Sequence, residues 1–228
     1  MASGRSGATS YVLGPRQELR LEVDWGQKVE LQLMKGMAEI FGTEMPLHHT
    51  FHLGVCKIAI FTWHGATVEL IGSHNAYTEE DTPMVLYANT HGILEARRVE
   101  SDNLGEPAPR VVIAGPTDTG KSSLCKILLG YASRLGRKPL YVDLDIGQGN
   151  ITVPGMISAI HADRPYSMDE GFSKQVPLVY FYGHADLATN EECYKRQVGT
   201  LFKELDLAVK DDTEGKLGTT LRKESPLT

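Results

Sequence analysis

Residues 115–122 read Gly-Pro-Thr-Asp-Thr-Gly-Lys-Ser, and this octapeptide constrains the fold of the chain more than any other feature. It fits the pattern of a phosphate-binding loop, which joins a strand to a helix. The flanking sequence agrees, because residues 110–114 form a short β-branched apolar run and residues 121–135 have a helical pattern. Further along, strands are predicted at 139–144 and 176–182, and a helix at 190–207. We therefore predict an α/β domain with a parallel sheet in the second half of the chain.

The loop predicts a site for the phosphates of a nucleotide. Its glycines allow turns that let successive N–H groups point at the β-phosphate, and the following helix directs its positive end at the same anion. The N–H groups in question belong to Asp118, Thr119, Gly120, Lys121, Ser122 and Ser123. Lys121 is predicted to reach the β- and γ-phosphates as a catalytic residue, and Ser122 to offer its hydroxyl to Mg²⁺. The alternative, a glycine-rich turn that contains Lys-Ser by chance, leaves the flanking strand and helix unexplained.

Two aspartates, Asp143 and Asp145, stand at the carboxyl end of the predicted strand 139–144. Ligands of open α/β sheets bind at that edge. A carboxylate there can orient Mg²⁺ or accept a proton from an attacking hydroxyl. Alternatively, one of the two caps the turn at residues 147–149, an interpretation that suits Asp143 as well as a catalytic one. We therefore predict Asp145 as the catalytic and Mg²⁺-binding carboxylate.

The first half of the chain has a different pattern. Over residues 18–72, apolar and polar residues alternate in short runs separated by glycines, which predicts an antiparallel sandwich or barrel. A helix is expected after Pro83, ending near Arg97 or Arg98, and the polar stretch 100–109 is the predicted linker. The predicted organisation is a flexible N-terminus (1–15), an all-β domain with a trailing helix (16–105), a partial P-loop domain (106–208) and a polar, unstructured tail (209–228).

Composition excludes several classes of protein. Hydrophobic residues make up 41% and charged residues 23%, which is typical of a globular protein, and no apolar run approaches the roughly 18 residues of a membrane helix. We therefore expect no membrane partner. Residues 1–10 lack the apolar stretch of a secretory signal, so we expect an intracellular protein. The net charge is −6 without a basic stripe, and any nucleic acid must be held locally.

Both halves of the sequence resemble the Clp1 family of polynucleotide 5'-hydroxyl kinases, which are subunits of the pre-mRNA cleavage factor. The resemblance extends over about residues 14–205. The segments that carry it are 18–23, 36–42, 61–65, 81–84, 89–91, 115–123, 143–149, 170–172 and 177–180. Because it includes the β domain as well as the phosphate-binding loop, it is more specific than the loop alone.

The resemblance implies a fold, a reaction and a setting. The fold would be an N-terminal β-sandwich followed by a P-loop NTPase domain, with the adenine of ATP between them. Glu18 and Lys57 would contact the nucleotide. Without the resemblance, the pattern alone would predict both residues as exposed strand charges. The reaction would be transfer of the γ-phosphate to the 5'-hydroxyl of RNA, with Mg²⁺ bridging the phosphates and Asp145 positioning or deprotonating the hydroxyl. The setting would be the nucleus, in pre-mRNA 3'-end cleavage and polyadenylation and in tRNA splicing, with a Pcf11-like cleavage factor subunit and the tRNA splicing endonuclease as partners.

Members of this family continue through further strands, an arginine-bearing lid and a C-terminal domain, so the resemblance implies a truncated chain. Two alternatives to a kinase follow. The first is an ATP-bound scaffold subunit that holds partners in the cleavage complex without turnover. The second is an unrelated P-loop ATPase or GTPase, which would leave the β domain unexplained and which nucleotide preference would test.

Overall fold

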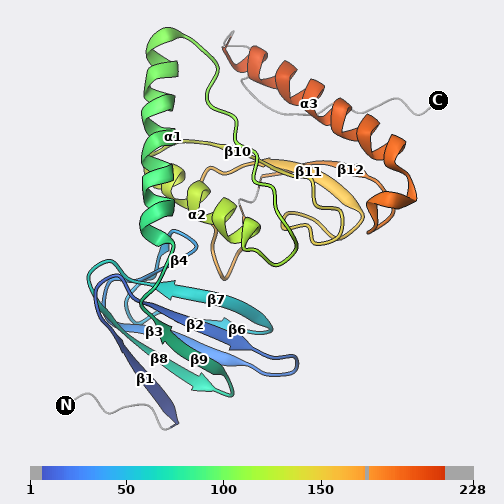
Figure 1. The fold of residues 1–228 in the computed structure, drawn as a ribbon. Helices are drawn as coiled ribbons and strands as arrows, with labels where there is room; N and C mark the ends of the chain where they lie inside the picture. Colours follow the sequence, from blue (N-terminus) through green and yellow to red (C-terminus); the bar gives the residue numbers. More distant parts are fainter. Residues whose placement is uncertain (1–6, 173–174, 214–228) are drawn as a thin grey trace. The chain divides into compact units, whose positions relative to one another are not determined.

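The computed structural model describes residues 7–172 and 175–213 (Figure 1). It divides into two compact units, which are described separately. The first contains the chain up to residue 141 together with residues 161–175, and the second contains residues 142–160 and the chain from residue 176. The order of elements matches the predicted fold class, an all-β domain followed by an α/β region.

The first unit begins with two antiparallel sheets that form a β-sandwich. One sheet has the strand order β1 (Ala8–Leu13), β8 (Ala66–Gly72), β3 (Val29–Gly36) and β6 (Thr50–Leu53). The other has the order β5 (Thr43–Glu44), β4 (Glu39–Ile40), β7 (Cys56–Phe61), β2 (Glu18–Val23) and β9 (Asn75–Glu79). The all-β prediction is thus confirmed as a sandwich. Strand β1 is a correction, because it lies within the N-terminal stretch that we expected to be flexible.

The core of the sandwich lies between the two sheets and follows the alternation in the sequence. On β2, Leu19, Leu21 and Val23 are at most 3% exposed, and alternate residues of β3, β7 and β8 are buried in the same cluster. Because successive side chains of a strand point to opposite faces, the residues between these leucines face away from the core. The outer face of the five-stranded sheet therefore carries the charged residues of β2.

Two helices of the first unit follow the sandwich. Helix α1 (Met84–Leu104) ends at Gly105, whose left-handed backbone (φ 66°) allows its N–H to bond the Ser101 carbonyl. The helix therefore continues past its predicted end near Arg98 and takes in half of the predicted linker, because the first residues that stop it are Gly105 and Pro107. Helix α2 (Lys121–Arg134) matches its prediction closely.

Residues 110–114, predicted as the first strand of the parallel sheet, form no strand. Val111 is 51% and Val112 is 90% exposed. A buried parallel strand forms only when neighbouring strands accept and donate its hydrogen bonds. In the described part of the chain, no strand pairs with this segment.

The second unit contains most of a three-stranded sheet in the order β10 (Leu140–Asp143), β11 (Met156–His161) and β12 (Leu178–Phe181). Strands β10 and β12 confirm two predicted strands, whereas β11 was not predicted. Strands β11 and β12 pair antiparallel, with Ile157 opposite Tyr180, which corrects the prediction of a parallel sheet at this pair. After the short helix η1 (Leu187–Thr189), helix α3 (Glu191–Thr213) extends into the predicted polar tail, whose later residues lie outside the described ranges. None of the helices described is both long and apolar enough to span a membrane.

Candidate nucleotide-binding site

The phosphate-binding loop turns directly into the first residue of α2. Asp118 (φ 60°) and Gly120 (φ 81°) adopt left-handed backbone conformations, and Gly120 is the N-cap of the helix. The Thr119 hydroxyl donates to the Pro116 carbonyl at 2.9 Å, and the Lys121 ammonium donates to the same oxygen. The loop is thereby closed on itself, with the Lys121 side chain folded over it.

The N-terminus of α2 is suited to an external anion. No side chain caps the helix, and its first turn contains no acidic residue. The first N–H groups of a helix have no partner within the helix, and a capping side chain usually satisfies them. At α2 no side chain takes this capping role, and the helix dipole adds partial positive charge at the same place. The arrangement is that of a phosphate site.

A cavity of about 450 Å³ joins this loop to the β-sandwich within the first unit. Its volume is that of a small-molecule site. It brings together six of the predicted nucleotide-binding residues, namely Glu18, Lys57, Asp118, Thr119, Gly120 and Ser123. Lys121 and Ser122 belong to the adjoining start of α2 and do not line this cavity. The start of α1 closes another side of the cavity with Met84 and Tyr87.

The sandwich wall of the cavity is a row of paired charges on β2. Glu18 is 4% exposed, and its carboxylate accepts a hydrogen bond from Arg20 Nε at 2.7 Å. This bond, followed by a hydrogen bond with Tyr77, raises the pKa of Arg20. Arg20 also lies 6.0 Å from the centre of the Tyr77 ring, its neighbour on β9. The wall therefore presents hydrogen-bonding groups and an aromatic ring with little uncompensated charge, which suits the neutral, polar ring of a nucleobase.

Lys57 is held less tightly than Glu18. Its ammonium lies 3.2 Å from the carboxylate of Glu22, its partner across β2 and β7, and its side chain is 80% exposed. An exposed pair of this kind contributes little to stability. The Lys57 side chain can therefore turn toward a bound nucleotide at small cost.

Several lining residues were missed in the sequence, including Arg20, Tyr77, Met84 and Tyr87. For Arg20 a signal existed, because Glu18, Arg20 and Glu22 alternate with buried leucines and so share the outer face of the sheet. The other three lie on β9 and α1, and only the folded chain brings them to β2.

Asp143 and Asp145 both organise the loop after β10, in the second unit. The buried Asp143 carboxylate accepts hydrogen bonds from the N–H groups of Asp145 (3.1 Å) and Asn150 (2.6 Å). Asp145 Oδ1 accepts from the N–H groups of Gly147 and Gln148, both at 2.9 Å. The capping interpretation is therefore confirmed for Asp145, which caps the turn at residues 147–149, whereas Asp143 binds N–H groups on either side of that turn. The Asp145 side chain is exposed and therefore accessible to a ligand. The Asp143 side chain is buried, and its contacts are with the backbone of the loop.

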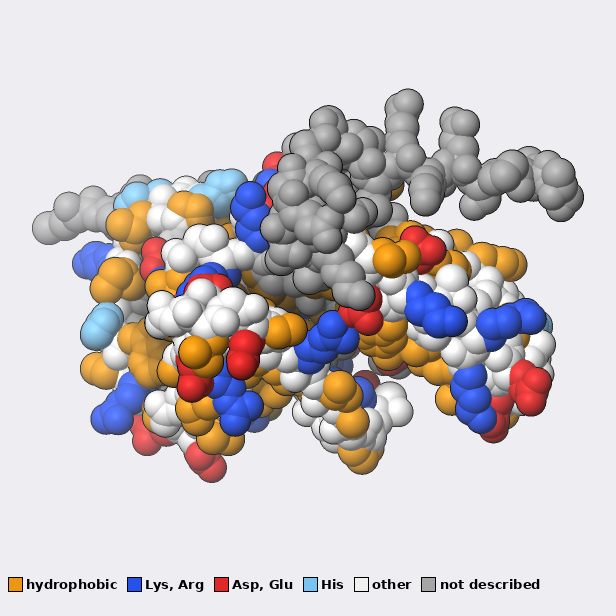
Figure 2. All heavy atoms as spheres, turned by 90° about the horizontal axis from the view of Figure 1, so that it is seen from above, with side chains coloured by type: hydrophobic (Ala, Val, Ile, Leu, Met, Phe, Trp, Pro, Cys, Tyr) orange, Lys and Arg blue, Asp and Glu red, His pale blue; other side chains and the backbone are white. Residues whose placement is uncertain are grey.

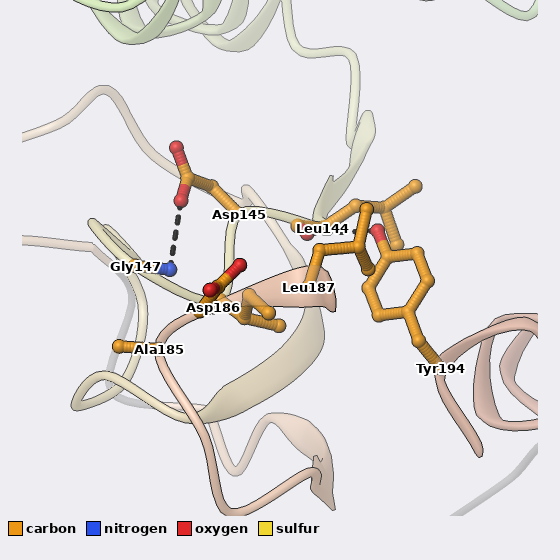
Figure 3. Close-up of a pocket in the computed structure, with 8 residues that line it drawn as sticks. Leu144, Asp145, Gly147, Ala185, Asp186, Leu187 and Tyr194 are labelled. Atoms are coloured by element: carbon orange, nitrogen blue, oxygen red, sulfur yellow. Dashed lines mark hydrogen bonds between the residues drawn. The ribbon is translucent and has the colours of Figure 1, made fainter. Parts of the chain in front are cut away.

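A second cavity, of about 370 Å³, opens beside Asp145 within the second unit (Figure 3). Its lining includes a second carboxylate, Asp186, from the loop after β12. The Tyr194 hydroxyl donates to the Leu144 carbonyl at 3.0 Å, and burial followed by the charges of Asp145 and Asp143 raises the pKa of Tyr194. Two carboxylates accept hydrogen bonds from a hydroxyl and repel a phosphate, so a hydroxyl-bearing ligand suits this cavity.

The predicted Mg²⁺ ligands fit that ion by their chemistry. Ser122 supplies a hydroxyl oxygen and Asp145 a carboxylate oxygen, and hard oxygen donors are the ligands of Mg²⁺. Within the described ranges, no group of three His, Cys, Asp or Glu side chains could hold a metal unaided. Mg²⁺ commonly takes one or two protein oxygens and completes its shell with water and nucleotide phosphates.

On the face shown in Figure 2, Lys and Arg side chains are interspersed with acidic and hydrophobic ones. A nucleic-acid ligand would therefore find few adjacent cations on this face.

Two family models match the chain in succession. The N-terminal beta-sandwich domain of polyadenylation factor matches residues 12–101, and the P-loop of mRNA cleavage and polyadenylation factor CLP1 matches residues 115–218. A Homo sapiens protein named Polyribonucleotide 5'-hydroxyl-kinase Clp1 is 49% identical over 191 residues, which are 82% of this chain and 45% of that protein. Its Danio rerio counterpart is 45% identical over 201 residues, with 87% and 45% covered. The chain thus spans about half the length of the curated relatives it matches.

Solved structures support the same fold. The wild-type Clp1p–Pcf11p complex superposes with a TM-score of 0.81 at 23% identity, covering 91% of this chain and 51% of that one. A second structure describes an extended interface between Pcf11p and Clp1p and the structural basis for ATP loss in a glycine-to-arginine mutant. It gives a TM-score of 0.77 at 23% identity and covers 88% of this chain and 51% of that one.

Proposed function

The chain belongs to the Clp1 family, and on this basis we propose that it binds ATP with Mg²⁺ and transfers the γ-phosphate to the 5'-hydroxyl end of RNA. One observation carries the proposal. The phosphate-binding loop and the charged outer face of β2 and β7 share one cavity, although about a hundred residues of sequence separate Glu18 from Asp118. A cavity that joins an anion site to a polar and aromatic wall has the form that a nucleotide requires.

Different residues of the first unit would bind different parts of ATP. The N–H groups at the start of α2 and the Lys121 ammonium bind the phosphates, and Ser122 offers an oxygen to Mg²⁺, which offsets charge on the phosphates when bound. Glu18, Arg20 and Lys57 bind the nucleoside. Because most catalysis of phosphoryl transfer is positioning and electrostatic stabilisation, these contacts account for much of what such a site must do.

The second unit would receive the acceptor. Asp145 orients the 5'-hydroxyl or accepts its proton, and Asp143 holds Asp145 in place through the N–H bonds described above. The carboxylate of Asp186 in the same cavity disfavours an end that already carries a phosphate. This arrangement supports a preference for 5'-hydroxyl ends.

We further propose a nuclear role in pre-mRNA 3'-end cleavage and polyadenylation and in tRNA splicing. A Pcf11-like subunit and the tRNA splicing endonuclease would be its partners. The names of the matched family models and the Clp1p–Pcf11p complexes support the first process and the first partner. The complexes also favour a second candidate function, an ATP-bound scaffold that assembles partners without turnover.

A phosphate-transfer assay separates the two functions. ATP labelled at the γ-phosphate is incubated with the chain, Mg²⁺ and a short RNA that bears a 5'-hydroxyl, beside the same RNA with a 5'-phosphate. The kinase predicts label on the first RNA only, with ATP preferred over GTP. ATP binding without any labelled RNA would refute the kinase for this chain and leave the scaffold.

Asp145→Asn is expected to lower the transfer rate by roughly 10²- to 10⁴-fold while ATP affinity is retained. Asparagine keeps an oxygen that can accept from Gly147 and Gln148, so the loop persists and only the charge is lost. Initial rates of labelling and ATP affinity are measured together. Glu192→Gln is the matched control, because it removes one exposed carboxylate of α3. An unchanged rate in Asp145→Asn would exclude Asp145 as the catalytic carboxylate.

A further inference from the structure

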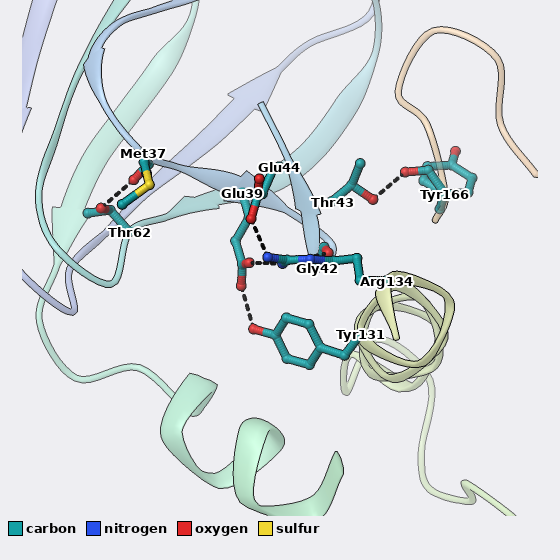
Figure 4. A network of polar contacts seen from close by, with 9 residues as sticks. All are labelled: Met37, Glu39, Gly42, Thr43, Glu44, Thr62, Tyr131, Arg134 and Tyr166. Atoms are coloured by element: carbon teal, nitrogen blue, oxygen red, sulfur yellow. Dashed lines mark hydrogen bonds and ion pairs between the residues drawn. The ribbon is translucent and has the colours of Figure 1, made fainter. Parts of the chain in front are cut away.

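A buried carboxylate of the sandwich is bound by two side chains of α2, the helix that carries the phosphate site (Figure 4). We propose that Glu39, Tyr131 and Arg134 are positioning residues: they fix α2 against the β-sandwich so that one ATP can contact both walls of the cavity. We call these three residues the α2 clamp. The inference rests on the proposed ATP binding and deepens it, by naming what sets the distance between the phosphate and nucleoside halves of the site.

The polar contacts of the clamp converge on Glu39. Its side chain is 5% exposed, Arg134 Nη1 donates to Oε2 at 3.0 Å, and the Tyr131 hydroxyl donates to Oε1. Burial, followed by the Glu39 carboxylate, raises the pKa of Tyr131, so its hydroxyl remains a donor. A buried charge that loses a partner is strongly destabilising, which makes these bonds selective for one position of the helix. Arg134 also pairs with Glu44, an exposed carboxylate that adds little.

The backbones of α2 and of the sandwich also pack closely beside the clamp. The turn between β4 and β5 lies so near α2 that a Cβ on Gly42 would be 2.9 Å from the Ile127 carbonyl oxygen. A Cβ on Gly130 would be 2.9 Å from the Phe41 carbonyl oxygen. Ile127, Gly130, Tyr131 and Arg134 fall on one face of the helix by their spacing. The polar contacts of the clamp and this backbone packing together form one continuous contact between α2 and the β4–β5 turn, which we call the seam.

The clamp is connected to the nucleotide site on its sandwich side, through Glu39, and on its helix side, through the backbone of α2. Glu39 itself lines the cavity, as do Phe41 and Gly42 in the adjoining turn. On the helix, about 15 Å of rigid backbone separates Tyr131 from Lys121 at the phosphate site. A shift of α2 at the clamp therefore moves the phosphate site relative to Glu18 and Lys57, even though the loop itself stays intact.

A comparison of two ligands distinguishes positioning from simple stabilisation. Inorganic tripolyphosphate needs only the loop and the start of α2, whereas ATP also needs the sandwich wall. Loss of the clamp should therefore weaken ATP and leave tripolyphosphate unchanged. General loss of stability would weaken both ligands or neither.

The experiment measures the dissociation constants of ATP and of tripolyphosphate, both with Mg²⁺, on the full chain. Tyr131→Phe is expected to weaken ATP about threefold, and Tyr131→Phe with Arg134→Met about tenfold or more, with tripolyphosphate within about twofold of wild type. Arg137→Met is the matched control. Arg137 comes shortly after the same helix and pairs with Glu95 and Asp102, but not with the clamp residues. The ratio of ATP affinity to tripolyphosphate affinity in Arg137→Met should therefore match that of wild type.

Tripolyphosphate binding also reports whether a variant is folded at the loop. A wild-type chain that binds no ATP would refute both the proposed function and the clamp. A wild-type chain that prefers ATP, together with variants that keep the same preference, would overturn the clamp alone. An equal loss of both ligands in the single Tyr131→Phe variant would also overturn it, because that result assigns the clamp to stability.

Discussion

Lys121→Ala is expected to lower phosphate transfer from ATP by at least roughly 100-fold, because it removes the loop cation that the proposed function assigns to the phosphates. Lys121 is the first residue of α2, and its ammonium folds over the loop onto the Pro116 carbonyl. Alanine has the highest helix propensity, so α2 and its N–H groups should persist. The loss is thus one of charge rather than of fold, and the melting temperature should stay close to that of wild type.

Initial rates of labelling, ATP affinity and the melting temperature are measured on the same preparation of Lys121→Ala. Lys138→Ala is the control, because it removes a lysine just beyond the other end of α2. Transfer by Lys121→Ala near the wild-type rate would refute a role of the Lys121 ammonium on the reacting phosphates. Equal losses in both variants would point to net charge rather than to this site.

The β-sandwich was predictable because its signal is local. Alternating leucines on β2 and β3 specify a strand with one buried face, and the glycines between strands mark the turns. The phosphate-binding loop was predictable for the same reason, since eight consecutive residues contain it. The cavity contains six of the predicted nucleotide-binding residues, and two of them, Glu18 and Lys57, were indicated only by the resemblance to Clp1. From pattern alone they were ordinary strand charges.

What could not be predicted depends on contacts between distant segments. Residues 110–114 have the composition of a buried strand, but a strand requires a partner, and pattern does not reveal whether one is present. The clamp bonds join Glu39 to residues 92 and 95 positions away. Tyr131 and Arg134 read as ordinary members of a helical pattern, and nothing in their spacing shows that a buried carboxylate lies opposite them.

Two helical glycines should respond differently to alanine. A Cβ added at Gly92 in α1 would meet no atom within 4 Å, so Gly92→Ala gains helix propensity, about 1 kcal/mol of unfolding free energy. Gly130 in α2 is buried against the β4–β5 turn, where a Cβ would lie 2.9 Å from one backbone oxygen and 3.1 Å from another. Backbone cannot rotate away as a side chain can, and overpacking of this kind costs about 1–3 kcal/mol. Gly130→Ala is therefore expected to be neutral to destabilising despite the same gain in propensity.

The pair tests the seam between α2 and the sandwich without touching any polar group of the clamp. Chemical denaturation of both variants gives the change in unfolding free energy, and ATP affinity is measured beside it. If α2 and the β4–β5 turn are in backbone contact, Gly130→Ala displaces α2 from the sandwich and lowers ATP affinity. Gly92→Ala leaves ATP affinity unchanged. A gain in stability at Gly130 equal to that at Gly92 would mean that helix and turn are not in backbone contact. The clamp would then lack the close packing that makes it selective for one helix position.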